Sequence, residues 1–368
     1  MNGFTAVFRK ELRQMVRDRM TLIFSIVVPV FELILFGVID MQAKNIATII
    51  FDQSNTQESR QLIDQFQNTS FLNVIGRAHS RKELQDAIVS ARAQVAIEIP
   101  PDYARNLAAN RQATVLILID GSDSSVASQA LNAANGVILQ NDIRDLLAKA
   151  RQAQLDVEPR PVMMFNPDMR SANLLIPGLI AIILTFSGTI LSAFAIVRER
   201  ERGTLEQLMV TPVSPLAVVL GKILPYLGVA YFTLLIILLL MNVLFQVPFH
   251  GSIGLLLLLA IIYLMALLSF GLLISSRAQT QVEAIQMAMG VMLPSVLLSG
   301  YVFPIPGLPA PLRVISYILP ATHFIRISRG IIIRGAAFGD IWPSVVALVA
   351  ISIVLITLSA TAFKKTIT

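Results

Sequence analysis

Six apolar stretches, each long enough to cross a lipid bilayer, constrain the fold of this 368-residue chain more than any other feature. A transmembrane helix needs about 20 predominantly apolar residues. Hydrophobic residues make up 55% of the chain and charged residues only 14%, which lies outside the range of an ordinary soluble domain. We therefore predict an α-helical polytopic membrane protein with six transmembrane helices, at residues 20–39, 174–197, 215–247, 254–274, 282–298 and 342–363.

Basic residues gather at alternate ends of these spans and predict the orientation of the chain. Cytosolic loops of membrane proteins carry an excess of Lys and Arg close to the spans. With six spans, one side of the membrane receives Arg9, Lys10, Arg13, Arg17, Arg19, Arg198, Arg200, Arg202, Lys222, Arg277, Lys364 and Lys365. We expect this side to be cytosolic, with both termini on it.

Residues 1–19 are expected to form an amphipathic helix at the cytosolic membrane interface. Apolar side chains recur at three- and four-residue spacing, at Phe4, Val7, Phe8, Leu12 and Met15, and the basic residues Arg9, Lys10, Arg13 and Arg17 lie on the remaining surface. This pattern is typical of a helix that lies in the lipid interface. Attraction to anionic lipids is enough to explain it.

A polar insertion at residues 42–172, after a first membrane segment at 20–41, is predicted to be a folded extracytoplasmic α/β domain. It is nearly neutral, with thirteen basic and fourteen acidic residues, and it contains no cysteine. Strand-like and helix-like runs alternate along it, which indicates a layered domain with a mixed sheet. The expected strands are 46–51, 72–75, 94–99, 114–119 and 162–165, and the expected helices are 55–66, one opened by the capping residues 80–83, 101–109 and 123–154.

The sequence carries no recognisable catalytic or metal-binding motif. The three histidines lie in different segments, without a partner at ligand spacing. The one Gly-Lys pair, Gly221-Lys222, has Leu216 and Ile223 where a nucleotide-binding P-loop requires Gly and Ser or Thr. We therefore expect no metal site, no cofactor bound by this chain and no enzymatic activity of its own.

A dense run of alternating charge, residues 198–212, separates the second and third apolar spans. Its first five residues are expected to continue the preceding helix into water, with opposite charges paired at helical spacing. Gly203 allows a turn, Thr204 with Gln207 forms a capping box for a short helix, and Pro212 ends that helix. The short helix either rests on the lipid surface or docks into a cytosolic partner.

The run Arg198–Pro212 resembles the signature of type-2 ABC exporter permeases, especially the bacterial multidrug-type members with a large exported domain. The resemblance covers nearly the whole chain, and the order and spacing of several segments carry it. The other matching segments are Phe8–Leu12, Asp52–Ser54, Glu58–Ser59, Phe270–Ser276, Leu298–Gly300 and Leu319–Phe324. The resemblance implies a permease of the bacterial inner membrane.

In that family the short helix after the second span is a coupling helix, which sits in a groove of a separate ATPase subunit. The resemblance therefore implies an ATPase-coupling role for Arg198, Glu199, Glu201, Gly203, Thr204, Leu205, Glu206 and Leu208. It also implies a second permease (a copy of this chain or a paralogue), ATP and Mg on the ATPase, and in many cases a membrane-fusion protein. The N-terminal helix would contact the ATPase as well as membrane lipids, and no nucleic acid is expected as a partner.

Glu32 is the most costly residue to place in the bilayer. It lies about two-thirds of the way across the first span, where an acidic side chain costs on the order of 2.5–3.5 kcal/mol to insert. One interpretation is a substrate or proton contact in the translocation path. The other is that Glu32 pairs with a neighbouring span or reaches external water.

Residues 300–340 place four arginines on the side expected to be external. Four prolines in the first part of this stretch break any continuous helix, and the helical segments that follow are too short to cross. The resemblance implies an external re-entrant helix pair, with arginines at the level of the lipid headgroups. The exit-gate positions that it implies are Leu298, Gly300, Pro320 and His323. The alternative is that this stretch crosses the membrane.

Two classes of function remain open from the sequence. The first is the permease subunit of an ATP-driven ABC exporter of hydrophobic or amphipathic compounds such as drugs. The second is a membrane-anchored sensor or assembly protein with an extracytoplasmic ligand-binding domain. A soluble ATPase that co-purifies with the chain would favour the first.

Overall fold

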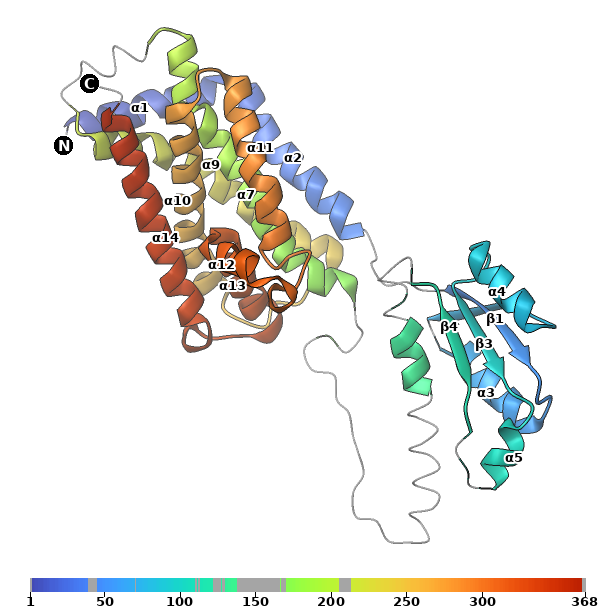
Figure 1. Cartoon of the computed structure of the whole chain (residues 1–368). Coiled ribbons are helices and arrows are strands. Elements are labelled where there is room, and N and C mark those ends of the chain that lie inside the picture. The colour runs from blue at the N-terminus through green and yellow to red at the C-terminus, as the bar shows by residue number, and fades with distance from the viewer. Residues whose placement is uncertain are drawn as a thin grey trace. The chain divides into compact units, whose positions relative to one another are not determined.

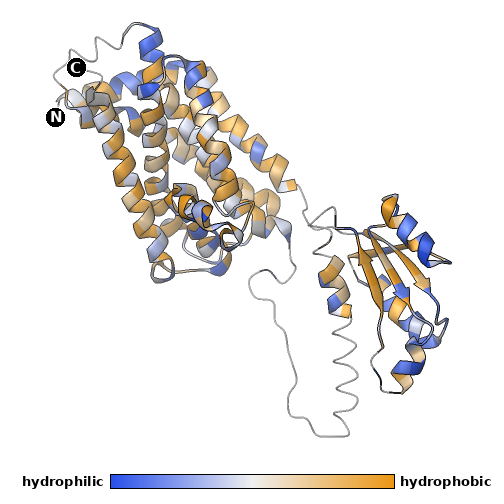
Figure 2. Cartoon of the chain, in the orientation of Figure 1, coloured by the Kyte–Doolittle hydropathy of each residue, from blue (hydrophilic) through white to orange (hydrophobic). Residues whose placement is uncertain are grey.

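The computed structural model describes residues 2–38, 45–69, 71–109, 111, 113–121, 127, 130–137, 166, 170–204 and 213–365. The chain divides into two compact units. The helical unit comprises Met1–Ile39 and Val162–Thr368, and the α/β unit comprises Asp40–Pro161. Hydrophobic residues dominate the long helices of the first unit, as Figure 2 shows.

Six helices of the described residues are long and apolar enough to span a membrane, which confirms the predicted fold class. They are α2 (Arg19–Val38), α7 (Ser171–Glu201), α9 (Pro215–Phe245), α10 (Ile253–Arg277), α11 (Gln281–Leu298) and α14 (Phe338–Lys365). The amphipathic helix α1 (Asn2–Arg17) precedes them. It lies at the same end of the helices as the C-terminal end of α14 (Figure 1).

Helix α7 is the central helix of this unit. It contacts α2, α9, α10, α11 and α13 (Pro320–Arg334). In its most hydrophobic stretch 78% of the residues are buried, against 50% or less in the other five spans. Polar groups inside the unit find partners: the hydroxyl groups of Thr185 and Tyr263 lie 2.6 Å apart, and the Tyr263 hydroxyl also donates to the Ala181 carbonyl oxygen at 2.9 Å.

Helix α1 comes close to α9 and to Val213, which precedes α9, at two positions where a glycine leaves room. A Cβ atom at Gly221 of α9 would lie 2.9 Å from the Val7 side chain, and one at Gly3 would lie 2.8 Å from Val213. Val7 is buried, whereas Leu12 on the same helix is 38% exposed. The apolar stripe predicted for the lipid interface therefore lies partly against protein.

Two shorter helices follow α11, namely α12 (Ala310–Ile318) and α13. Of the prolines that were expected to interrupt a helix, Pro304, Pro306 and Pro309 stand in the turn and the 3-10 helix Ile305–Gly307 before α12, and Pro311 stands in the first turn of α12. Arg326 lies 5.0 Å from the centre of the Tyr317 ring, in a cation–π arrangement. Arg329 is half-buried, and its guanidinium donates to the Gly300 carbonyl oxygen at 3.2 Å.

The α/β unit is built on a mixed sheet, as predicted, and among the described residues this sheet has four strands in the order β2-β1-β3-β4. Strand β1 is parallel to both neighbours, and β4 is antiparallel to β3. The strands are β1 (Ile46–Asp52), β2 (Leu72–Arg77), β3 (Val95–Ile99) and β4 (Leu116–Ile119), and the helices are α3 (Gln57–Gln67), α4 (Arg81–Val89) and α5 (Tyr103–Ala108).

Alternate side chains of the strands build a core on each face of this sheet. Ile46 and Ile50 pack with α3 and α5 on one face, and Ile49 packs with α4 on the other. Ser80 caps α4 as the sequence predicted, because its hydroxyl accepts from the Glu83 N–H. The strand predicted at 162–165 and most of the helix predicted at 123–154 lie outside the described residues, although 130–137 are helical.

Candidate functional site

Helix α7 ends in a well-defined turn directly before the segment predicted to couple to an ATPase. Gly203 adopts a left-handed conformation with φ +68°, which favours glycine. The N–H of Gly203 donates to the Arg200 carbonyl oxygen, and the N–H of Thr204 donates to that of Glu199. This pair of hydrogen bonds is the Schellman motif, and it stops the helix at a defined residue. Residues 205–212, and with them Leu205, Glu206 and Leu208, lie outside the described residues.

Glu199, in the last turn of α7, belongs to a buried cluster of charges. Lys222 of α9 lies 3.0 Å from the Glu199 carboxylate and 2.7 Å from the carboxylate of Glu11 on α1. Lys10 of α1 also pairs with Glu199. The side chains of Glu11, Glu199 and Lys222 are at most 3% exposed. Buried charges are tolerated when they are paired, so this cluster fixes the relative positions of α1, α7 and α9.

Arg198 links α7 to the start of α2. Its guanidinium lies 2.5 Å from the carboxylate of Asp18, which also accepts from the N–H and the hydroxyl of Thr21. Partial burial alone would raise the pKa of Asp18, but the hydrogen bonds from Thr21 and the charge of Arg198 outweigh it and lower this pKa. Asp18 therefore stays ionised as the partner of Arg198.

Arg200 and Glu201, the next two residues of α7, contact the end of α10 and the start of α11. The Arg200 guanidinium donates to the backbone carbonyl oxygens of Ser276, at 3.0 Å, and of Ala278, where α10 ends. The Glu201 carboxylate accepts from the backbone N–H of Gln281, the first residue of α11, at 2.8 Å and from its side chain.

Four consecutive side chains thus join the end of α7 to five other helices, and we call Arg198, Glu199, Arg200 and Glu201 the α7 junction. Successive residues of a helix point in directions about 100° apart, so consecutive charges spread around its axis. The prediction that these charges stay in water is wrong for Glu199, which is buried, whereas Glu201 and Arg202 are exposed. The prediction that they pair within their own helix is wrong for Arg198 and Glu199, whose partners lie outside α7.

A basic groove of about 880 Å³ lies between α1 and the α7 junction. Its charged lining consists of one acidic residue, Asp18, and six basic residues, Arg9, Lys10, Arg13, Arg17, Arg198 and Arg202. Such a groove attracts anionic groups.

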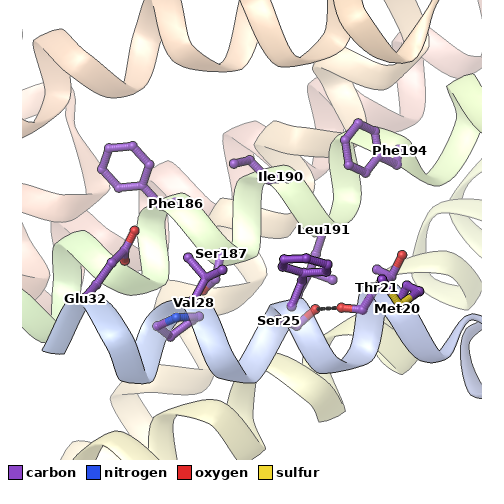
Figure 3. Close-up of a pocket in the computed structure, with 12 residues that line it drawn as sticks. Met20, Thr21, Ser25, Val28, Glu32, Phe186, Ser187, Ile190, Leu191 and Phe194 are labelled. Carbon is purple, nitrogen blue, oxygen red and sulfur yellow. Dashed lines mark hydrogen bonds between the residues drawn. The ribbon is translucent and has the colours of Figure 1, made fainter. Parts of the chain in front are cut away.

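Glu32 lies on α2, away from the α7 junction. It lines a separate pocket between α2 and α7, together with Ser25 of α2 and with Phe186 and Ser187 of α7. Its carboxylate points from α2 toward α7 (Figure 3). Among the described residues it has no ion-pair or hydrogen-bond partner, so the pairing with a neighbouring span that the sequence left open is not seen there.

The four residues implied as an exit gate lie around the end of α11 and the helices α12 and α13. The carbonyl oxygen of Leu298 accepts from the Ser316 hydroxyl at 2.5 Å, and that of Gly300 accepts from Arg329. Pro320 is the first residue of α13, and the buried His323 ring is 2.9 Å from the Tyr317 carbonyl oxygen through Nε2. The structure brings these residues into one region, and their role as a gate stays a prediction.

Sequence reasoning missed the pairing of Glu11 with Lys222. Two signals for it are present in the sequence. Glu11 falls within the apolar stripe of α1, four residues after Val7, and Lys222 stands inside an apolar span. An ionisable residue within a span is rare and usually has a partner.

The comparisons with known proteins agree with this architecture. Residues 19–361 match the family model described as ABC-2 family transporter protein. In Escherichia coli (strain K12), the probable multidrug ABC transporter permease YbhR is 31% identical over 94% of each chain. The inner membrane transport permease YhhJ is 30% identical over 97% of this chain and 96% of its own length. The probable multidrug ABC transporter permease YbhS is 29% identical over 89% and 87%, respectively.

The chain belongs to the ABC-2 family of transporter proteins, since the family model covers most of its length. It is a multi-pass membrane protein with the architecture of a transport permease. The resemblance drawn from the charged run and the later segments is thereby confirmed.

Proposed function

We propose that this chain is the membrane-spanning subunit of an ATP-driven exporter, and that a separate ABC ATPase subunit powers it. The observation that carries the proposal is the α7 junction, which ties the end of α7, just before residues 205–212 in the sequence, to five helices at once. A force applied to that segment reaches the whole helical unit through charged contacts rather than through one flexible loop. ATP and Mg are bound by the partner in this proposal.

The cargo that we propose is a hydrophobic or amphipathic compound. Two of the relatives are named as probable multidrug permeases. The pocket at Glu32 has mostly apolar walls, as binding sites for such compounds do. A second permease, either a copy of this chain or a paralogue, completes the proposed transporter, and a membrane-fusion protein is a further proposed partner.

Co-purification tests the ATPase partnership. Glu206→Arg reverses the charge of the one acidic residue in the segment 205–212. We expect the unmodified chain to co-purify with a soluble ATPase that carries Walker motifs and hydrolyses ATP, and the variant to retain at most about a tenth of it, because charge reversal in an interface costs several kcal/mol. The α/β-unit variant Glu58→Arg is the matched control, since Glu58 is exposed. An active transporter without any such ATPase would contradict the proposal.

The proposed orientation places both termini in the cytosol of a bacterial inner membrane and the α/β unit outside. The basic groove between α1 and the α7 junction supports it, because cytosolic flanks carry the excess of Lys and Arg. A fluorescent protein that folds only in the cytosol, fused after Thr368, should fluoresce, and alkaline phosphatase fused there should stay inactive. The reverse pair of results would show that residues 300–340 cross the membrane.

A further inference from the structure

The pocket between α2 and α7 combines apolar walls with one uncompensated acid. Its volume is about 350 Å³, within the usual range for small-molecule sites. Apart from Glu32, its polar side chains are the hydroxyls of Thr21, Ser25 and Ser187. Thr21 and Ser25 are already engaged, because Thr21 donates to Asp18 and Ser25 donates to the Thr21 carbonyl oxygen.

Two polar groups of this pocket therefore remain for an occupant. The Ser187 hydroxyl oxygen is buried and has no hydrogen-bond partner among the described residues. The Glu32 carboxylate likewise has no ion-pair or hydrogen-bond partner among the residues that the structure describes. A carboxylate within a membrane span is costly and usually pairs or lines a functional pathway. An occupant with a positive charge supplies the missing counter-ion.

The aromatic walls indicate what kind of cation fits. Phe24 of α2 and Phe186 and Phe194 of α7 line the same pocket as Glu32. Aromatic rings attract cations and bury apolar surface at the same time. A small, strongly hydrated ammonium or metal ion would lose its water here for few polar contacts. A cation whose charge is spread over an apolar body keeps both kinds of contact.

The pocket is also accessible from the side of the helical unit. On α2, Met20 is 64% exposed, Phe24 56% and Val28 41%. An apolar molecule dissolved in the membrane can therefore reach the pocket along the exposed side of α2, without passing the α7 junction.

We propose that this pocket binds a lipophilic monocation, with Glu32 as its counter-ion and the phenylalanines as its walls. The inference deepens the proposed export function and rests on it for the claim that this ligand is cargo. Binding itself is a property of this chain alone. It is therefore measured without the ATPase.

Tetraphenylphosphonium and tetraphenylborate form a matched pair of probes, since they share size and shape and differ in the sign of the charge. Each is measured by equilibrium dialysis against the full-length chain in lipid nanodiscs, with empty nanodiscs as background. We expect Glu32→Gln to weaken tetraphenylphosphonium binding about tenfold or more, because the cation loses its counter-ion in a largely apolar site. Tetraphenylborate binding should not weaken. Glu32→Asp keeps the charge and should keep most of the cation binding.

Glu58→Gln, which removes one exposed negative charge from the α/β unit, controls for net charge and should leave both probes unchanged. Phe186→Ala should weaken tetraphenylphosphonium binding while the carboxylate remains. If Glu32→Gln changes the binding of neither probe, or changes the binding of both equally, the inference is overturned and the pocket holds a neutral occupant such as a lipid chain. If binding is unaffected by Glu32→Gln but the permease still exports with its ATPase, only this inference is overturned. If no ATPase co-purifies with the chain, the proposed function is overturned and the binding result still holds.

Discussion

Lys222→Met is expected to destabilise the helical unit by about 3–5 kcal/mol, the usual cost of removing one partner from a buried ion pair. Lys222 is 1% exposed and lies between two buried carboxylates, those of Glu11 and Glu199. Without it Glu11 loses the one ion-pair partner that it has among the described residues, while Glu199 retains Lys10. Thermal unfolding of the purified permease in detergent measures the effect as a lower Tm.

Two further variants separate charge from packing in this experiment. Arg277→Met removes an exposed basic side chain from the end of α10, so it should change the free energy of unfolding by no more than about 0.5 kcal/mol. The double variant Glu11→Leu/Lys222→Met removes both members of one pair and should recover most of the lost stability. Equal Tm values for Lys222→Met and Arg277→Met would contradict the account of the cluster.

The recovered double variant also distinguishes a coupling role from a structural one. Its helices are again stable, but α1 is no longer held to α9 by charge. If the cluster relays motion, export should stay low while the ATPase remains bound. Full export by this variant would show that the Glu11–Lys222 pair serves stability only.

Gly271→Ala is expected to cost about 1–3 kcal/mol, because α7 and α10 approach too closely at this point for a side chain. A Cβ atom at Gly271 would lie 2.1 Å from the Ser192 hydroxyl oxygen and 2.3 Å from the Thr189 carbonyl oxygen. The second of these is a backbone atom, so α7 itself must shift. A lower Tm and a lower yield of monodisperse protein would record the change.

Gly290→Ala on α11 is the matched control for this substitution. Nothing lies within 4 Å of a Cβ atom at Gly290, and alanine favours a helix by up to about 1 kcal/mol over glycine. This control should therefore keep or raise the Tm. Adding Ser192→Ala to Gly271→Ala should relieve only part of the loss, because the Thr189 carbonyl oxygen remains. Equal Tm values for Gly271→Ala and Gly290→Ala would contradict the predicted clash.

Hydropathy predicts the spans well because the thickness of the bilayer fixes both the length and the composition of a spanning helix. The predicted third span at 215–247 corresponds to α9, Pro215–Phe245, and Ser214 caps its start. The alternating pattern likewise predicts a mixed sheet in the α/β unit. Its strand order requires knowledge of contacts between distant residues, and the sequence alone does not provide them.

The α7 junction and the Glu32 pocket were predictable only in part, because local signals mark positions on the chain but not which distant residues pack together. The charged run marks the right place on the chain, and Gly203 its turn, because both are local signals. The buried pairing of Glu199 with Lys222 depends on how α7 faces α9. Glu32 stands out by its cost in the bilayer, whereas the approach of Phe186 and Ser187 from α7 depends on tertiary packing.

The central claim, that a separate ATPase engages the segment next to the α7 junction, is tested most directly by site-specific crosslinking. The chain has no cysteine, so Glu206→Cys provides a single thiol for a benzophenone label. The account predicts a light-dependent adduct between this position and the ATPase, and none from Glu58→Cys in the α/β unit. In a complex that still hydrolyses ATP, the absence of any ATPase adduct from position 206 would contradict the account.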